Sequence, residues 1–517
     1  MTVAANRSLW TRLSAAFLAA ALGTWLPVAA QAPAITVNAR LVVLDVVVTG
    51  PDGRPVNNLT ADDFRVFEDG KVQRIRSVEP PSSHELPMES AAMDSVFDPA
   101  RPTAFGHSPV DILMLDQLNT HFADASFARR SVGDYLSHQP SLLPEPTTLL
   151  SLYDDHFQSL HPFTRDRDAL LRALAAAQNH KAWKLDLDGK AGHGPIDRLD
   201  QSLRALEEIA QSYAAIPGRK NLIWVGGGFP TIDADTVAPH DFQEVQQTLQ
   251  HITDVLLETR VTVYAVDPTS SASSLTEITD ESQAAFIDAA GDSLGNNAEP
   301  FNSSADFDKL GPVTGGRTIH GRNDIARQIA SSADLGASFY TLAYTPSSTS
   351  DTEARYRSIR VVCLRPGLTA RTRSGYYSGE PQQLRSAATY DLTTAAEGPM
   401  PLNGLHVTVE RDPTNPGNFV IRAGVSKLTW MVKADGSAST SVYVLAVSLN
   451  QQNKMLSHML QGMTANARAG TDLNDGLRTA NFHLTVHPAP KAKLLRFIVR
   501  DSASGRMGSF DLPIPRH

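Results

Sequence analysis

The feature that most constrains the fold is a series of short apolar runs, each followed by sequence with helical spacing. Ile112 to Leu115 is such a run, and helix-like sequence follows from Ala123 to Leu136. Lys220 to Val225 and Val261 to Val266 are further runs of this kind. A continuous apolar run of this length is typical of a strand buried on both faces. Because strands that alternate with helices favour a parallel sheet, we expect an α/β fold with helices on both faces of the sheet.

One helix is predicted with particular clarity, between Ile196 and Ile216. Its apolar residues recur at the three- and four-residue spacing that places them on one face of a helix. These residues are Leu199, Leu203, Leu206, Ile209 and Ala210. Pro217 and Gly218 end the pattern, as expected just beyond a helix. The stripe predicts that this helix packs on the sheet.

Polar side chains follow the carboxyl ends of the predicted strands, and this edge is where open α/β sheets bind ligands. Asp116, Asn119 and Thr120 follow the first strand, Gly227 lies in the Gly226 to Gly228 turn after a second, and Asp267 follows a third. We take these five residues as the candidate binding site. In the alternative interpretation, Asp116 and Asn119 cap the first helix and satisfy its free amides, and the glycines only let the loops pack closely.

Two stretches carry a resemblance to known proteins. The loop Asp116-Gln-Leu-Asn-Thr120 resembles the end of the first strand in von Willebrand factor A domains, which reads Asp-x-Ser-x-Ser. Leu59-Thr-Ala-Asp-Asp-Phe-Arg-Val-Phe-Glu-Asp-Gly-Lys71 resembles the opening module of the VWFA-related family of bacterial secreted proteins. The resemblance extends from about Val37 to Tyr377 and recurs at Arg500 to Gly505. It implies a divergent A-type α/β domain that recognises a protein or cell-surface partner, and it implies no known reaction.

The resemblance also implies a metal site, which this sequence has largely lost. Magnesium needs hard oxygen ligands in near-octahedral geometry. Asp116 and Thr120 keep a carboxylate and a hydroxyl, but Leu118 stands where a serine is expected, and the turn at Gly226 to Gly228 lacks the family's carboxylate. We therefore expect a degenerate site at which Mg²⁺ or Mn²⁺ binds weakly or not at all. We expect no other cofactor.

The expected domain organisation follows from these patterns and from the turn-rich sequence between short strands in the C-terminal part. We predict a signal peptide at residues 1–30, an N-terminal β module at 33–80, a linker at 81–109, a von Willebrand A-like domain at 110–346 with an insertion at 269–308, a β extension at 347–385, and a C-terminal β-sandwich at 386–517.

Composition and the N-terminus bear on location and partners. Arg7 and Arg12 precede an apolar stretch from Leu13 to Leu26, so we expect a signal peptide cleaved after Ala30 and a secreted or periplasmic protein, with an uncleaved anchor as the alternative. No later segment is long and apolar enough to span a bilayer. A net charge of -9 without a basic cluster argues against nucleic-acid binding. The single cysteine, Cys363, excludes an intrachain disulfide and is expected to be buried.

Two other functions compete with binding. Gly291-Asp-Ser-Leu-Gly295 matches the nucleophile elbow, which would make the chain a hydrolase using Ser293, or alternatively a metal-bound water near Asp116. Helix-like sequence before Ser293 instead favours the end of a helix. The 16 histidines show no zinc-binding motif. A structural envelope scaffold is the third interpretation. We expect a secreted, non-enzymatic binding or adhesion-type protein.

Overall fold

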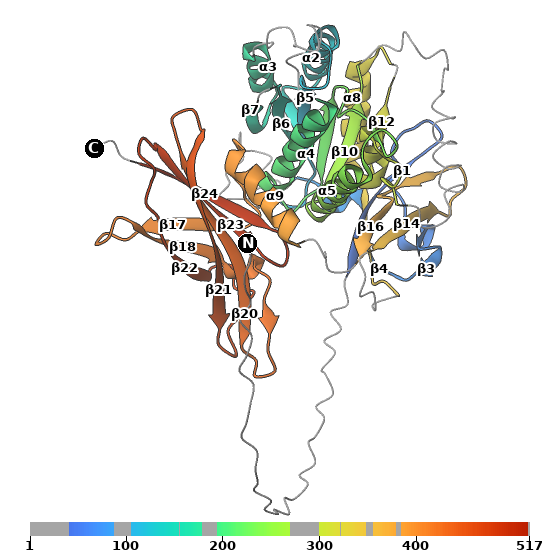
Figure 1. The fold of residues 1–517 in the computed structure, drawn as a ribbon. Coiled ribbons are helices and arrows are strands. Elements are labelled where there is room, and N and C mark those ends of the chain that lie inside the picture. The colour runs from blue at the N-terminus through green and yellow to red at the C-terminus, as the bar shows by residue number, and fades with distance from the viewer. Residues whose placement is uncertain are drawn as a thin grey trace, which may run out of the picture. The chain divides into compact units, whose positions relative to one another are not determined.

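The computed structural model describes residues 41–86, 105–154, 156–177, 194–268, 299–320, 322–347, 355–378 and 384–514 (Figure 1). The predicted signal peptide, most of the predicted linker, and the part of the predicted insertion that contains Ser293 lie outside the described residues.

A six-stranded mixed sheet carries the candidate loop. Its strand order is β12-β10-β8-β5-β6-β7. The strands are β5 (Val110–Asp116), β6 (Leu142–Leu152), β7 (Phe157–Asp166), β8 (Lys220–Val225), β10 (Val261–Val266) and β12 (Arg317–Ile319). The first five strands in that order are paired in parallel, whereas β7 lies antiparallel to β6 at the edge.

Helices cover both faces of this sheet. Successive side chains of β5 point to opposite faces, so they enter two different cores. Ile112 and Met114 share a core with α4 (Pro195–Ser212) and α5 (Pro239–Glu258). Leu113 and Leu115 share a second core with α2 (Phe122–Ser137), α3 (Arg167–Ala176) and α8 (Ile325–Ala337). The strand is therefore buried on both faces, as its continuous apolar sequence requires.

Two antiparallel sheets join the N-terminal segment to residues 340–378. Their orders are β15-β1-β13-β4 and β16-β14-β2-β3. The strands are β1 (Val42–Thr49), β2 (Phe64–Glu68), β3 (Lys71–Gln73), β4 (Ile75–Glu79), β13 (Tyr340–Tyr344), β14 (Arg355–Cys363), β15 (Thr369–Arg371) and β16 (Gly375–Ser378). The two sheets share one apolar core, which includes Leu44, Val66 and Leu342. Neither segment could bury its apolar side chains without the other.

The C-terminal part consists of two antiparallel sheets and one helix. The sheets are β17-β18-β22 and β19-β20-β23-β24, with β21 paired to β20. The strands are β17 (Val407–Arg411), β18 (Asn418–Gly424), β19 (Met431–Val432), β20 (Ala438–Leu449), β21 (Met455–Ala467), β22 (Thr479–Thr485), β23 (Leu494–Asp501) and β24 (Met507–Pro513). Helix α9 (Leu384–Glu397) packs Leu392, Ala395 and Ala396 on the face of β20 and β23 that points away from the other sheet (Figure 1).

Short elements complete the described chain. They are the two-stranded pair β9 (Ile232–Asp233) and β11 (Ser304–Ala305), helix α7 (Leu310–Thr314), and the 3-10 turns η1 (Ala61–Asp63), η2 (Pro81–His84), η4 (Phe307–Lys309) and η5 (Val425–Lys427).

The predicted fold class, an α/β chain built on a von Willebrand A-type parallel sheet, is wrong. Most strand pairs in the described residues are antiparallel, and the six-stranded sheet itself is mixed. At the end of the predicted von Willebrand A-like domain (110–346), β13 does not join the parallel sheet but lies antiparallel between β1 and β4. Strand β7 was not predicted at all. An apolar run shows that a strand is buried, but it does not say which distant strand lies beside it.

The segment predicted as a C-terminal β-sandwich, 386–517, is not built of strands alone, because α9 occupies residues 384–397. Its apolar residues are spaced to line one side of a helix, so that they cover the sheet. Cys363 is buried in β14, as expected. Within the described part of the chain, no helix has both the length and the apolar composition needed to cross a bilayer.

Candidate functional site

The candidate loop begins where β5 ends, at Asp116, whose side chain is almost completely buried. The helix that follows begins at Phe122, and its N-cap residue is His121, whose side chain makes no capping hydrogen bond. The interpretation that Asp116 and Asn119 cap this helix is therefore wrong. Asp116 instead accepts from the amides of Leu118 and Asn119, which lie in the loop before Phe122, the first residue of the helix.

Both carboxylate oxygens of Asp116 accept hydrogen bonds from N–H groups of the protein. Oδ1 accepts from the backbone amides of Leu118, at 3.0 Å, and Asn119, at 2.9 Å. Oδ2 accepts from the indole Nε1 of Trp224, at 3.0 Å, and from the amide of Gly228, at 3.1 Å. The Nδ2 of Asn119 lies 3.2 Å from Oδ2 as a further donor. A carboxylate has about four acceptor positions, so internal donors occupy all of them.

Burial and hydrogen bonding shift the pKa of Asp116 in opposite directions. Burial raises the pKa of Asp116 to about 6, although the hydrogen bonds from Asn119, Trp224 and Leu118 favour the ionised form and limit the rise. At neutral pH the group is therefore a carboxylate. Its negative charge is stabilised by N–H dipoles and by a favourable charge interaction with Arg198.

The glycine turn after β8 packs directly on this loop. A Cβ added at Gly226, where φ is +156°, would lie 2.5 Å from the Cβ of Asp116 and 2.6 Å from Oγ1 of Thr120. The amide of Gly227 donates to Oγ1 of Thr120 at 2.9 Å, and the amide of Gly228 donates to Asp116. The two amides thus bind side chains of the protein, not an external anion. The glycines serve the close packing that the sequence favoured.

The residues at this loop do not fit a magnesium or manganese ion. Asp116 has no free acceptor position, and the hydroxyl oxygen of Thr120 already accepts from Gly227. Leu118 points into the apolar core beside β5 and is fully buried. A metal would have to displace several buried hydrogen bonds, each of which is costly to break.

Asp267, the fifth candidate residue, belongs to a different network. Its Oδ2 lies 3.1 Å from Nδ1 of His320, whose Nε2 lies 2.9 Å from a carboxylate oxygen of Asp308. Hydrogen bonds to these two carboxylates raise the pKa of His320 to about 10. The structure therefore brings Asp116, Asn119, Thr120 and Gly227 together and leaves Asp267 in an ion triad after β10.

A second cluster of buried charges lies where α4 and α5 meet α9 and β23, and the sequence analysis missed it. Nε2 of His251 lies 2.5 Å from Oδ1 of Asp391, and Nε of Arg500 donates to Oδ2 of Asp391 at 2.6 Å. Glu207 on α4 completes the group and is fully buried. The sequence did contain one indication of this cluster, because Glu207 lies on the apolar face of α4, one turn after Leu203.

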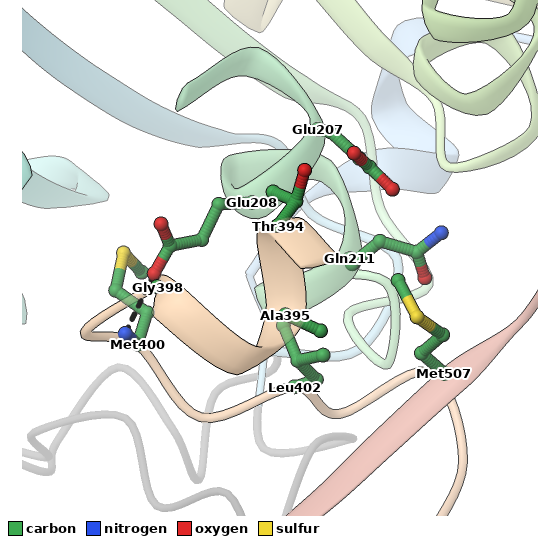
Figure 2. Close-up of a pocket in the computed structure, with 9 residues that line it drawn as sticks. All are labelled: Glu207, Glu208, Gln211, Thr394, Ala395, Gly398, Met400, Leu402 and Met507. Atoms are coloured by element: carbon green, nitrogen blue, oxygen red, sulfur yellow. Dashed lines mark hydrogen bonds between the residues drawn. The ribbon is translucent and has the colours of Figure 1, made fainter. Parts of the chain in front are cut away.

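A narrow recess lies beside this cluster, between α4, α9 and the start of β24 (Figure 2). The amide of Met400 donates to Oε1 of Glu208 at 2.6 Å. Burial raises the pKa of Glu208 to about 8. The recess is lined by Glu207, Glu208, Gln211, Thr394, Ala395, Gly398, Met400, Leu402 and Met507, and it has no room for a water molecule.

Comparison with known proteins identifies no relative from which a function could be transferred. No family model and no curated protein matches the chain. Among solved structures, the chain is similar to an endonuclease/exonuclease/phosphatase from Beutenbergia cavernae DSM 12333, with 11% sequence identity and a TM-score of 0.09. The match covers 35% of this chain and 38% of that chain. A likeness with so low a TM-score carries no information on fold or activity.

Proposed function

We propose that this chain is an exported, non-enzymatic binding protein that recognises a protein or cell-surface partner without a metal ion. The observation that carries the proposal is the saturation of Asp116 by internal N–H donors. A loop held in this way is a rigid scaffold that needs no cation to keep its shape. It also disfavours a hydrolase that would use a metal-bound water near Asp116.

The surface that we propose for recognition is the exposed rim of this loop. Phe122, the first residue of α2, is 47% exposed directly after the loop. Asn119 and Gly227 are partly exposed beside Asp116. Exposed aromatic side chains on rigid supports are enriched in protein interfaces. We call Asn119, Phe122 and Gly227 the loop rim.

Titration calorimetry with Mg²⁺ and with Mn²⁺ tests the metal-free part of the proposal. The wild type and Asp116→Ala are compared under the same conditions, and circular dichroism confirms that the variant folds. We expect the wild type and Asp116→Ala to give the same heats, with no metal-binding signal that the substitution abolishes. Saturable binding in the wild type that Asp116→Ala abolishes would refute metal-free recognition and restore a metal-dependent site.

The loop rim is tested with Phe122→Ala and a matched control. Leu142 on β6 is 45% exposed, so Leu142→Ala removes a comparable apolar surface elsewhere. Immobilised wild type and variants are incubated with intact cells and with envelope extract. We expect Phe122→Ala to reduce retention of the partner and Leu142→Ala to leave it unchanged. Equal retention by all three proteins would show that the loop rim is not the recognition surface.

Export rests on the N-terminal sequence and has a direct test. If cleavage follows Ala30, mass spectrometry of the protein recovered outside the cytoplasm will find Gln31 as the first residue. The relation to the VWFA-related family is likewise our proposal. This proposal rests on the sequence of residues 59–71 and does not depend on the fold class.

A further inference from the structure

The cluster of Glu207, His251 and Asp391 is assembled from three helices that are far apart in the sequence. The residues lie on α4, α5 and α9 respectively, and one ligand atom of each lies within 4.8 Å of the others. Both carboxylates are completely buried, and the side chain of His251 is 22% exposed. An imidazole and two carboxylates are groups that bind metal ions in proteins, and here they lie close enough to bind one ion together.

Glu207 supplies an independent sign that the cluster holds a ligand. Both of its carboxylate oxygens are buried, and no N–H group of the described residues donates to them; their polar neighbours are the carboxylate of Asp391 and the hydroxyl of Thr394. Within the same described part of the chain, the hydroxyl oxygen of Tyr390 beside Glu207 is also buried without a partner. Buried polar groups are nearly always satisfied, and two adjacent buried carboxylates repel each other.

Asp391 is oriented so that one of its oxygens faces the other two residues. Arg500 binds Oδ2 through Nε and Nη2, each at 2.6 Å. Oδ1 faces Nε2 of His251. Carboxylates that bind metals are commonly held in this way by a further hydrogen-bond donor, which fixes their orientation. Arg500 also supplies a positive charge that offsets one of the two buried carboxylates.

We propose that Glu207, His251 and Asp391 bind a divalent transition-metal ion of the zinc class. Zn²⁺ takes imidazole nitrogen and carboxylate oxygen as ligands at about 2.0–2.2 Å, whereas Mg²⁺ and Ca²⁺ prefer oxygen alone. The ion would replace the hydrogen shared by His251 and Asp391, so the imidazole must shift outward slightly. Its partial exposure permits that shift and gives the ion a route of entry.

The bound ion would connect two layers of the fold. Its ligands join α9, which packs on β20 and β23, to α4 and α5, which pack on the six-stranded sheet. The ion would clamp these two layers together. This site is separate from the loop at Asp116 and does not depend on the function proposed there.

The test is titration of the purified full chain with Zn²⁺, and with Co²⁺ followed by its visible spectrum, which reports coordination geometry. We compare the wild type with Glu207→Gln and His251→Gln. His240→Ala is the matched control, because His240 lies on the same helix near Glu244 but is 78% exposed. We expect one site in the wild type, binding weakened at least about tenfold in both cluster variants, and no change in the control.

Several outcomes would overturn the proposal. The absence of saturable Zn²⁺ or Co²⁺ binding by the wild type would do so. Binding that persists in both cluster variants and disappears in His240→Ala would identify an adventitious surface site. Circular dichroism confirms folding, which we expect to survive in Glu207→Gln because glutamine has nearly the same size and shape as glutamate. Asp116→Ala should leave Zn²⁺ binding unchanged, which separates this test from that of the proposed function.

Discussion

Asp116 combines a sequence position typical of metal ligands with surroundings that leave no place for a metal. The sequence indicates the position, since the residue follows a buried strand at the binding edge of a sheet. The donors to Oδ1 are in the same loop, whereas two donors to Oδ2, Trp224 and Gly228, lie more than 100 residues later in the chain. Tertiary contacts therefore place the carboxylate that was predicted to bind a metal at the centre of a hydrogen-bond network.

Asp116→Ala should strongly destabilise the protein. The substitution leaves the amides of Leu118 and Gly228 and the indole N–H of Trp224 buried without an acceptor. Each such group costs about 1–3 kcal/mol, so we expect the free energy of unfolding to fall by at least about 3 kcal/mol. Urea denaturation measures it. Asp116→Asn, which keeps one acceptor oxygen, should lose less, and a loss below about 1 kcal/mol in the alanine variant would contradict the network.

His320 should make part of the stability depend on pH. Hydrogen bonds to Asp267 and Asp308 raise its pKa to about 10, above the ordinary histidine value of 6.5. Because the folded pKa is raised, the stabilisation is complete below pH 6.5, declines as the pH rises, and disappears near pH 10. His320→Gln should therefore destabilise the protein at pH 6 and have no effect at pH 10. The effect at pH 6 is modest, since solvent screens a side chain that is 39% exposed.

Denaturation curves at the two pH values test this expectation. His458→Gln, on the exposed strand β21, serves as the control and should show no such pH dependence. An equal loss of stability in His320→Gln at pH 6 and pH 10 would mean that the ion triad does not stabilise the fold.

At the scale of single elements, the sequence predicts a helix or turn well when the interactions that form it are between residues close together in the chain. The apolar stripe of α4 is confirmed, since all five of its predicted residues are buried. The turn after Thr60 is equally local, because the carboxylate of Asp63 accepts from the Thr60 amide at 2.7 Å. Glu207 lies on the same face of α4, and helical spacing alone does not reveal which residues it faces.

The glycine turn after β8 is an element whose geometry requires glycine. Gly226→Ala would place a methyl group 2.5 Å from Cβ of Asp116, which forces the two loops apart. We expect a loss of about 1–3 kcal/mol, as for other overpacked sites, measured by thermal or chemical denaturation. Gly476→Ala is the control, because a Cβ there meets nothing within 4 Å. Equal effects of the two substitutions would refute the close approach of the loops.

At the scale of the whole molecule, distant segments complete one another. Strands from residues 42–79 pair with strands from residues 340–378, so neither forms its sheets alone. Helix α9 is likewise held from two sides, by the apolar residues that cover β20 and β23 and by the bond between His251 and Asp391. The predicted domain boundaries stay a prediction, but these contacts cross several of them.

Arg500→Met should weaken the contact between α9 and β23. It leaves Asp391 buried without its guanidinium partner, and breaking a buried ion pair in this way costs about 3–5 kcal/mol. We expect a lower thermal midpoint and a smaller free energy of unfolding. The double variant Asp391→Leu/Arg500→Met removes both charges and should recover part of the loss. A double variant that is less stable than Arg500→Met would contradict this account of the pair.

The sequence by itself determined the local elements: the buried strand before Asp116, the stripe of α4, the turn after Thr60 and the burial of Cys363. These depend on periodicity and on neighbours a few residues away. Only the tertiary structure decided which strands pair, and so overturned the fold class. It also decided that Asp116 is saturated and that Glu207 and His251 meet Asp391. The physical reason is the same in each case: the deciding partner lies far away in the chain, and apolar or charged character alone does not identify it.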